Sequence, residues 1–259
     1  MKRELRGIYL GRRRYTPILE LQELLHARRV ARSIGDTVLL LEHDPVITLG
    51  RGAHLEHLLV SEATLAERGV DFVKTGRGGD ITLHAPGQLV AYPILDLQPD
   101  RADVRRYVKD LARVMQEVAG SLGVASGLHP EHVGLWADRT APSAFASHDA
   151  AGELVKIGAI GVRISRWVTM HGFALNLSPD MDTFRLIVPC GIREYGVASV
   201  QSLGGAALAM ESAAERAFAA FRAVFDAAPS ELERYDGDDW ERLFPPPTES
   251  QRALTDGAP

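Results

Sequence analysis

The stretch Arg77-Gly78-Gly79-Asp80-Ile81-Thr82-Leu83-His84-Ala85-Pro86-Gly87-Gln88-Leu89-Val90 alternates glycine-rich turns with short apolar runs. Its glycines and proline indicate turns, and residues 81–83 and 89–95 are typical of buried strands. Two long helices are predicted further along the chain, at about residues 101–122 and 206–227. Strands joined by tight turns, with helices before and after them, predict an α/β fold, more fully an α+β-like mixed sheet flanked by helices.

Working outward from this stretch, the sequence predicts further elements on both sides. Thr16-Pro17 is expected to open a helix with Thr16 as its cap, and Gly35 to end it. A hairpin is expected around a turn at Ser165-Arg166. A short helix is predicted at residues 61–68, and further strands at residues 37–42, 46–49, 70–74, 133–137, 154–164 and 168–177.

No internal repeat or linker divides the sequence. Residues 1–244 are therefore predicted to form a single domain, and a polar loop is expected at residues 138–152. The tail of residues 245–259 is polar and rich in proline near its start. Such a composition cannot bury enough apolar surface to order the chain, so we predict that this tail is disordered.

The composition limits the classes of function. The chain has 259 residues, 46% of them hydrophobic, and a formal net charge of −5. General nucleic-acid binding needs a basic surface, which this charge does not provide. No run approaches the roughly 20 apolar residues that cross a bilayer, and the first residues lack a secretory signal pattern. The single cysteine allows no internal disulfide, which fits a reducing compartment. We expect a cytoplasmic protein without nucleic-acid or membrane partners.

The turn Arg77-Gly78-Gly79-Asp80 is a candidate binding nest. Consecutive glycines allow positive φ, so that several backbone N–H groups can point at one ligand. A carboxylate, a phosphate or an acyl carbonyl would fit, although a plain hairpin turn has the same composition. The turn is neither a P-loop nor a dinucleotide fingerprint, because G-x-x-x-x-G-K-[ST] is absent and no helix follows the glycines.

The only cysteine, Cys190, lies between Pro189 and Gly191. A thiolate is the strongest nucleophile that a side chain offers. A single cysteine is also commonly a small buried hydrophobe, and the apolar residues 186–188 just before it fit that alternative. Cys190 is therefore a candidate nucleophile that needs partners.

Two residues could assist Cys190. Lys156 lies in the apolar, glycine-rich segment 154–161. Burial favours the neutral amine, so Lys156 is a candidate general base and a candidate cationic neighbour for a thiolate; the alternative is a strand-edge lysine that points to water. His84, beside a tight turn, could shuttle protons or orient the thiol, or be a structural histidine. Cys190, Lys156 and His84 together predict a cysteine acyl-transfer site.

Metal and serine-hydrolase chemistry have weaker support. The pairs His54-x-x-His57 and His129-x-x-His132 lie in polar segments, with no cysteine or carboxylate at ligand spacing. No Gly-x-Ser-x-Gly elbow is present. We predict no metal site.

In four segments the chain resembles one known family, the lipoyl(octanoyl) transferases (octanoyl-[acyl-carrier-protein]:protein N-octanoyltransferases). The segments follow the family's order and nearly its spacing. Ala85 stands where the family usually has glycine, and Gly158 where it usually has alanine. The matching segments are residues 41–51, residues 77–90, residues 156–176 and the run Pro189-Cys190-Gly191-Ile192.

This resemblance implies the fold of the catalytic domains of biotin and lipoate protein ligases. It also implies a reaction, the first step of endogenous protein lipoylation. An octanoyl or lipoyl group passes from acyl carrier protein to Cys190 as a thioester, and then to a lysine of a lipoyl domain. In the family the lysine that matches Lys156 tunes the cysteine and handles protons.

The resemblance further implies the partners and the binding residues. The acceptors would be lipoyl domains of 2-oxoacid dehydrogenases and the H protein of glycine cleavage. No cofactor is expected beyond the phosphopantetheine that acyl carrier protein carries. The segments that wrap the acyl chain and its carbonyl would comprise Arg77, Gly78, Gly79, Asp80, Ile81, Thr82, Leu83, His84, Ala159, Ile160, Gly161, Gly172, Phe173 and Ala174.

Two other functions remain open at this point. An ATP-dependent lipoate or biotin ligase would share the fold but would need a nucleotide site and no nucleophilic cysteine. A non-catalytic module would bind acyl carrier protein or lipoyl domains without forming a thioester. A basic patch at residues 12–14 or 28–29 is a further hypothesis for the docking of acidic acyl carrier protein.

Overall fold

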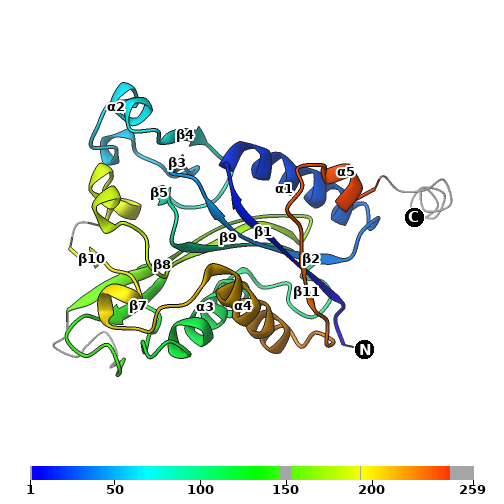
Figure 1. Ribbon diagram of the computed structural model, residues 1–259. Helices are drawn as coiled ribbons and strands as arrows, with labels where there is room; N and C mark the ends of the chain where they lie inside the picture. The colour runs from blue at the N-terminus through cyan, green and yellow to red at the C-terminus, as the bar shows by residue number, and fades with distance from the viewer. Residues whose placement is uncertain (1, 146–152, 193, 246–259) are drawn as a thin grey trace.

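The structure, a computed structural model, describes residues 2–145, 153–192 and 194–245 (Figure 1). Residues 146–152 of the predicted polar loop and all but the first residue of the predicted disordered tail lie outside these ranges. In chain order the helices and strands are β1 (Leu5–Arg13), α1 (Tyr15–Val30), β2 (Asp36–His43), β3 (Val46–Leu49), α2 (Glu62–Glu67), β4 (Asp71–Lys74), β5 (Ile81–His84), β6 (Gln88–Ile94), α3 (Val104–Gly120), β7 (Leu135–Asp138), β8 (Leu154–Ser165), β9 (Val168–Asn176), β10 (Gly196–Val197), α4 (Met210–Val224), β11 (Leu232–Arg234) and α5 (Trp240–Leu243).

A large mixed sheet forms the centre of the molecule. Its strands follow the order β10-β8-β9-β6-β2-β1-β11, and β7 pairs with β8. The strands from β2 through β6 and β9 to β8 are antiparallel, whereas β1 is parallel to both β2 and β11. Helices α3 and α4 cover one face and α1 covers the other (Figure 1). The predicted mixed sheet flanked by helices is confirmed.

Strand β2 shows why the sheet is covered on both sides. Val38 and Leu40 pack into the core beneath α3 and α4, whereas Leu39 and Leu41 pack into the core beneath α1. Successive side chains of a strand point to opposite faces, so a continuous apolar run requires two covered faces.

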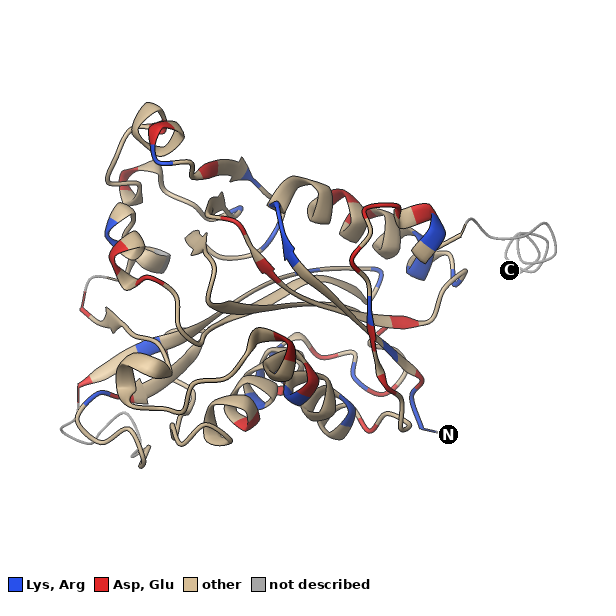
Figure 2. Cartoon of the chain, in the orientation of Figure 1, with Lys and Arg blue, Asp and Glu red and all other residues tan. Residues whose placement is uncertain are grey.

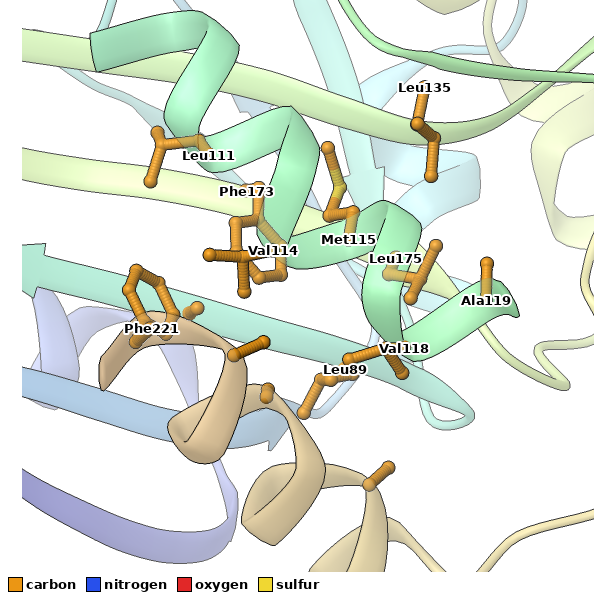
Figure 3. Packing of buried hydrophobic residues seen from close by; sticks show 14 of the residues in the cluster. Leu89, Leu111, Val114, Met115, Val118, Ala119, Leu135, Phe173, Leu175 and Phe221 are labelled. Atoms are coloured by element: carbon orange, nitrogen blue, oxygen red, sulfur yellow. The ribbon is translucent and has the colours of Figure 1, made fainter. Parts of the chain in front are cut away.

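Helix α3 supplies much of the packing on its face of the sheet. Its apolar stripe faces the sheet, and Phe221 of α4 lies beside it (Figure 3). Phe173 of β9 stacks on Phe221, with ring centroids 5.9 Å apart. The residues of α3 and of the strands that meet here include Leu111, Val114, Met115, Val118, Leu89 and Leu175.

A second, three-stranded sheet, in the order β4-β3-β5, lies above the large sheet with α2 beside it (Figure 1). The predicted start of α2 is confirmed, because the Ser61 hydroxyl accepts a hydrogen bond from the Thr64 N–H at 3.1 Å. Gly69 follows the helix with φ +66°, as expected for a residue that ends one. This small sheet holds the glycine-rich turn before β5 against the large sheet.

Two predictions about the N-terminal part were wrong, and one strand there was missed. Helix α1 begins at Tyr15, with Arg14 at the cap position, and no side chain caps it. It ends at Val30, well before Gly35. Strand β1 was not predicted, because the charged residues among residues 2–14 obscure its alternating apolar positions.

No helix in the described ranges combines the length and hydropathy needed to span a membrane.

Gly7 in β1 provides a test of the packing between the large sheet and α4. A Cβ atom at Gly7 would lie 2.4 Å from the buried ring of Phe218, so this ring leaves no space for a methyl group. We expect Gly7→Ala to lower the free energy of unfolding by about 1–3 kcal/mol in urea denaturation. Gly35→Ala is the matched control, because no atom lies within 4 Å of the added Cβ. Equal stability of the two variants would contradict this packing.

Candidate active site

A small pocket, with a cavity volume of about 40 Å³, lies between the small sheet and strands β6, β8 and β9. Most residues of the predicted binding set line it. Tyr15, Tyr92 and His171 line it as well and were not in that set. The predicted residues in the wall are Arg77, Gly79, Asp80, Thr82, His84, Ala159, Ile160, Gly161, Gly172, Phe173 and Ala174.

Three residues of the predicted set do not line the pocket. Ile81 and Leu83 pack into a separate apolar cluster with Ile47 of β3, because alternate residues of β5 face opposite sides. The N–H of Gly78 donates to the carbonyl of Val162 in β8 at 2.9 Å. Gly78 therefore joins the glycine-rich turn to the large sheet and cannot offer this N–H to a ligand.

The register of the β8–β9 hairpin brings the two other predicted segments together. Ala159 pairs with Ala174, and Ile160 pairs with Phe173. Gly161 pairs with Gly172, and a Cβ atom at Gly172 would lie 2.1 Å from the carbonyl oxygen of Ala91 in β6. The segments 159–161 and 172–174 thus form one continuous wall.

Arg77 is buried in the opposite wall. Its Nη2 donates to the Thr48 carbonyl at 2.6 Å and its Nε to the Thr48 hydroxyl at 3.1 Å. Glycines give the guanidinium its space: a Cβ atom at Gly50 would lie 2.9 Å from Nη1, and one at Gly161 would lie 3.3 Å from Cδ. The cation is therefore a fixed part of the pocket wall.

His84 is buried in an aromatic cluster. Its ring stacks on Tyr15 with centroids 6.0 Å apart and lies 5.6 Å from the ring of His43. Burial, together with the neighbouring His43 and the Arg77 charge, lowers the pKa of His84 well below its usual value. His84 is thus a neutral imidazole near neutral pH, which suits a hydrogen-bonding or orienting role better than that of a cation.

His43 is held in one tautomer. Its Nδ1 lies 3.0 Å from the Arg13 carbonyl, which can only accept, so Nδ1 carries the proton. Its Nε2 then accepts from the Tyr92 hydroxyl at 2.8 Å. Burial lowers the pKa of His43 to about 4.

Lys156 is 5% exposed, as the apolar character of its segment predicts. Its Nζ lies 5.7 Å from the ring centroid of Trp136 on β7, within range of a cation–π contact. Gly134 makes room for the side chain: a Cβ atom there would lie 2.5 Å from Cε of Lys156. Strand pairing on both edges of β8 fixes the backbone at Lys156.

Cys190 lies in the 3₁₀ turn η3 (Pro189–Gly191). This turn packs beside β5 and beside another 3₁₀ turn, η1 (Leu55–His57). Gly191 has φ +69°, and a Cβ atom on it would lie 3.0 Å from Oδ2 of Asp80, a residue of the pocket wall. The cysteine-bearing turn is therefore in contact with the wall of the pocket.

The structure also pairs His57 with Asp80, which the sequence did not indicate. Nδ1 of His57 is hydrogen-bonded to Oδ2 of Asp80. The two residues are far apart in sequence, so no local spacing pattern could reveal the pair. Among the residues described, no three histidine, cysteine or acidic side chains gather as metal ligands.

The arginines of the two hypothesised basic patches, at residues 12–14 and 28–29, bind oxygen acceptors nearby. Arg12 pairs with Asp44, and Arg14 pairs with Asp71. Arg29 pairs with a buried carboxylate, and Arg28 donates to the carbonyls of Phe244 and Pro245. Acidic and basic residues are interspersed around β1 and α1 (Figure 2). These arginines therefore do not form a uniformly positive face.

The same fold occurs in known ligases. Lipoate-protein ligase A bound with ATP has a TM-score of 0.64 at 14% identity, covering 99% of this chain and 95% of that one. LipL1 of P. falciparum in complex with lipoate has a TM-score of 0.67 at 9% identity, covering 97% and 71%. A putative lipoate protein ligase of T. acidophilum has a TM-score of 0.62 at 13% identity, covering 99% and 94%. The fold is thus that of lipoate protein ligase catalytic domains.

Sequence comparison is more specific. The lipoyl protein ligase A/B catalytic domain family matches residues 14–222. Octanoyltransferases are 46% identical over 217 residues (Myxococcus xanthus; 84% of this chain, 58% of the relative) and 45% identical over 217 residues (Solibacter usitatus; 84% and 91%). A third, from Chloroflexus aggregans, is 43% identical over 228 residues, covering 88% and 97%. The chain belongs to the octanoyltransferases of the lipoyl protein ligase A/B family, which are acyltransferase enzymes.

The buried histidines predict a pH dependence of stability. Burial lowers the pKa of His43 to about 4 and that of His171 to about 3, whereas both protonate near 6.5 in the unfolded chain. Between about pH 6.5 and pH 4 the unfolded state therefore binds more protons. The free energy of unfolding should fall as the pH falls through this window, by about 1.4 kcal/mol per pH unit for each buried histidine.

His171→Asn is the variant for this measurement, because asparagine tolerates the φ of +59° at this position and does not titrate. Urea denaturation across this pH window gives the slope of the free energy of unfolding against pH. In the variant this slope should correspond to one proton fewer than in the wild type. An unchanged slope would show that His171 does not remain neutral in the folded state.

Proposed function

We propose that the enzyme transfers an octanoyl group from acyl carrier protein to a lysine of a lipoyl domain, through a thioester on Cys190. The contact between the Cys190 turn and the wall of the pocket carries this proposal. Asp80 lines the pocket and also touches Gly191, so an acyl group in the pocket would have its carbonyl end near the cysteine-bearing turn. Membership of the octanoyltransferases supports the same reaction.

The pocket walls fit a straight apolar chain. Ile160, Phe173 and Ala174 supply apolar surface, and Gly161 and Gly172 let the chain approach the backbone closely. The histidines in the walls are neutral near neutral pH because their burial lowers their pKa values. A saturated acyl chain would therefore meet no charged histidine in these walls.

In the first half-reaction the Cys190 thiolate attacks the thioester carbonyl of octanoyl-phosphopantetheine. A carbon–sulfur bond forms to Cys190 as the bond to the phosphopantetheine sulfur breaks. Lys156 accepts the thiol proton and returns it to the departing phosphopantetheine thiol. Once Lys156 holds this proton it is a cation, and a cation near a cysteine favours the thiolate form.

In the second half-reaction the ε-amine of the acceptor lysine attacks the Cys190 thioester. An amide bond forms, the thiol of Cys190 leaves, and Lys156 takes the proton that the amine loses. His84 orients the carbonyl as a neutral hydrogen-bonding group. A thioester is higher in free energy than an amide, so the proposed reaction needs neither a nucleotide nor a metal.

The acceptors in this proposal are the lipoyl domains of 2-oxoacid dehydrogenases and the H protein of glycine cleavage. The donor carries its acyl group on phosphopantetheine, and the enzyme itself holds no cofactor. We place the reaction in the cytoplasm, where reducing conditions keep the single cysteine as a free thiol.

Intact mass spectrometry tests the covalent intermediate. Wild-type protein mixed with octanoyl-acyl carrier protein, without ATP, should gain the mass of one octanoyl group. The Cys190→Ser variant should gain none, because a serine hydroxyl is not ionised near neutral pH. Octanoylation of a lipoyl domain that requires free octanoate and ATP, with no adduct on the enzyme, would instead identify a ligase, which the shared fold allows. Carrier binding without any adduct would indicate a non-catalytic module.

A substitution at Lys156 tests the proton-transfer role. Lys156→Met keeps the length and apolar stem of the side chain but removes the amine, so acyl transfer should fall by at least about 100-fold. Lys109→Met is the matched control, because Lys109 is exposed on α3; its transfer rate should match that of the wild type. A Lys156→Met enzyme with wild-type acylation and transfer rates would exclude Lys156 as the proton carrier.

A further inference from the structure

The His57–Asp80 pair lies between the Cys190 turn and the pocket. Nδ1 of His57 is hydrogen-bonded to Oδ2 of Asp80, and the side chains are only 14% and 13% exposed. Asp80 reaches the pocket wall, whereas His57 belongs to the neighbouring turn η1. The reaction proposed above assigns no part to this pair.

Asp80 holds the η1 turn with both carboxylate oxygens. Oδ2 binds the His57 ring, and Oδ1 accepts the backbone N–H of His54 at 3.0 Å. The carbonyl of Asp80 accepts the N–H of Gly50 at 3.1 Å, so the residue itself is anchored to the end of β3. The His57 ring is therefore fixed by its own turn and by the wall of the pocket.

The η1 turn in turn holds the chain that leads to Cys190. The N–H of Val188 donates to the carbonyl of His57 at 2.8 Å, and the N–H of Leu59 donates to the carbonyl of Leu186 at 2.9 Å. On the other side of Cys190, a Cβ atom at Gly191 would lie 2.7 Å from Cε1 of His57. Contacts to His57 thus occur both before and after Cys190.

We propose that His57 and Asp80 are a positioning pair that holds the Cys190 turn at the acyl pocket. This inference rests on the proposed function, in which Cys190 takes the acyl group. A nucleophile must approach within about 3–3.5 Å in the right direction, and a displacement of about 1 Å can cost about 100-fold in rate. The hydrogen bond between the two largely buried side chains keeps the ring in place, because breaking it would leave buried polar groups without partners.

Three variants separate positioning by this hydrogen bond from other roles. His57→Ala removes the donor and leaves the buried Oδ2 of Asp80 without it. His57→Asn restores an N–H close to the place of Nδ1 but cannot act as an imidazole base. His54→Ala is the matched control: its ring lies on the same turn, 5.5 Å from that of His57, and it reaches Asp80 only through its backbone N–H.

The measurement is the rate of Cys190 acylation by octanoyl-acyl carrier protein, followed by intact mass, with the thermal midpoint of each variant. His57→Ala should lower the maximal rate by about 100-fold, without raising the carrier concentration needed for half-maximal rate. His57→Asn should recover most of this loss, and His54→Ala should stay close to the wild type. If His57→Ala does not fold, Asp80→Asn, which keeps the size but not the charge, should lower the maximal rate.

Several results would overturn the inference. One is an acylation rate equal to that of the wild type in His57→Ala or Asp80→Asn. Another is a His57→Asn variant that is acylated as slowly as His57→Ala. A wild-type protein that forms no octanoyl adduct would overturn the proposed function instead. In that case the rate at which iodoacetamide alkylates Cys190 tests the positioning role. Equal alkylation rates in the wild type and His57→Ala would exclude that role.

Discussion

Arg77 lies where the small sheet meets the large sheet, in the wall of the pocket. Through Thr48 it is hydrogen-bonded to β3 of the small sheet, while the next residue, Gly78, donates to Val162 of the large sheet. A charge this deeply buried is stable only when its donors have partners. The glycines at positions 50 and 161 supply the space, because larger residues would collide with the Arg77 side chain. Arginine and glycines are thus one structural unit, although they are spread over three segments.

The positive charge of Arg77 also shifts the pKa values of neighbouring side chains in the site. Its charge helps to keep His84 and His171 neutral by lowering their pKa values, and it opposes the rise in the pKa of Tyr15 that burial causes. The two histidines in the pocket wall are therefore neutral near neutral pH. In the proposed reaction the proton carrier is Lys156, whose Nζ lies 5.7 Å from the ring centroid of Trp136 on β7.

The sequence predicted the parts of the site that local patterns encode. The resemblance to the family assigned residues 159–161 and 172–174 to the binding site, and strand pairing makes them neighbours in the hairpin. Ile81 and Leu83 were assigned to the pocket as part of a motif, but strand alternation points them into another core. Tyr15, Tyr92 and the His57–Asp80 pair could not be predicted, because only the packing of distant segments brings them to the site. Likewise the mixed sheet was predictable, but its N-terminal strand was hidden among charged residues.

Strand β1 has one more consequence, which concerns synthesis. It is the first strand of the described chain to be made, yet its outer neighbour is β11, near the end. While the chain is still on the ribosome, the outer edge of β1 has backbone groups without a strand partner. An open edge of this kind can pair with another chain. The nascent protein therefore carries an open strand edge at β1, and this edge is covered only after residues 232–234 have been made.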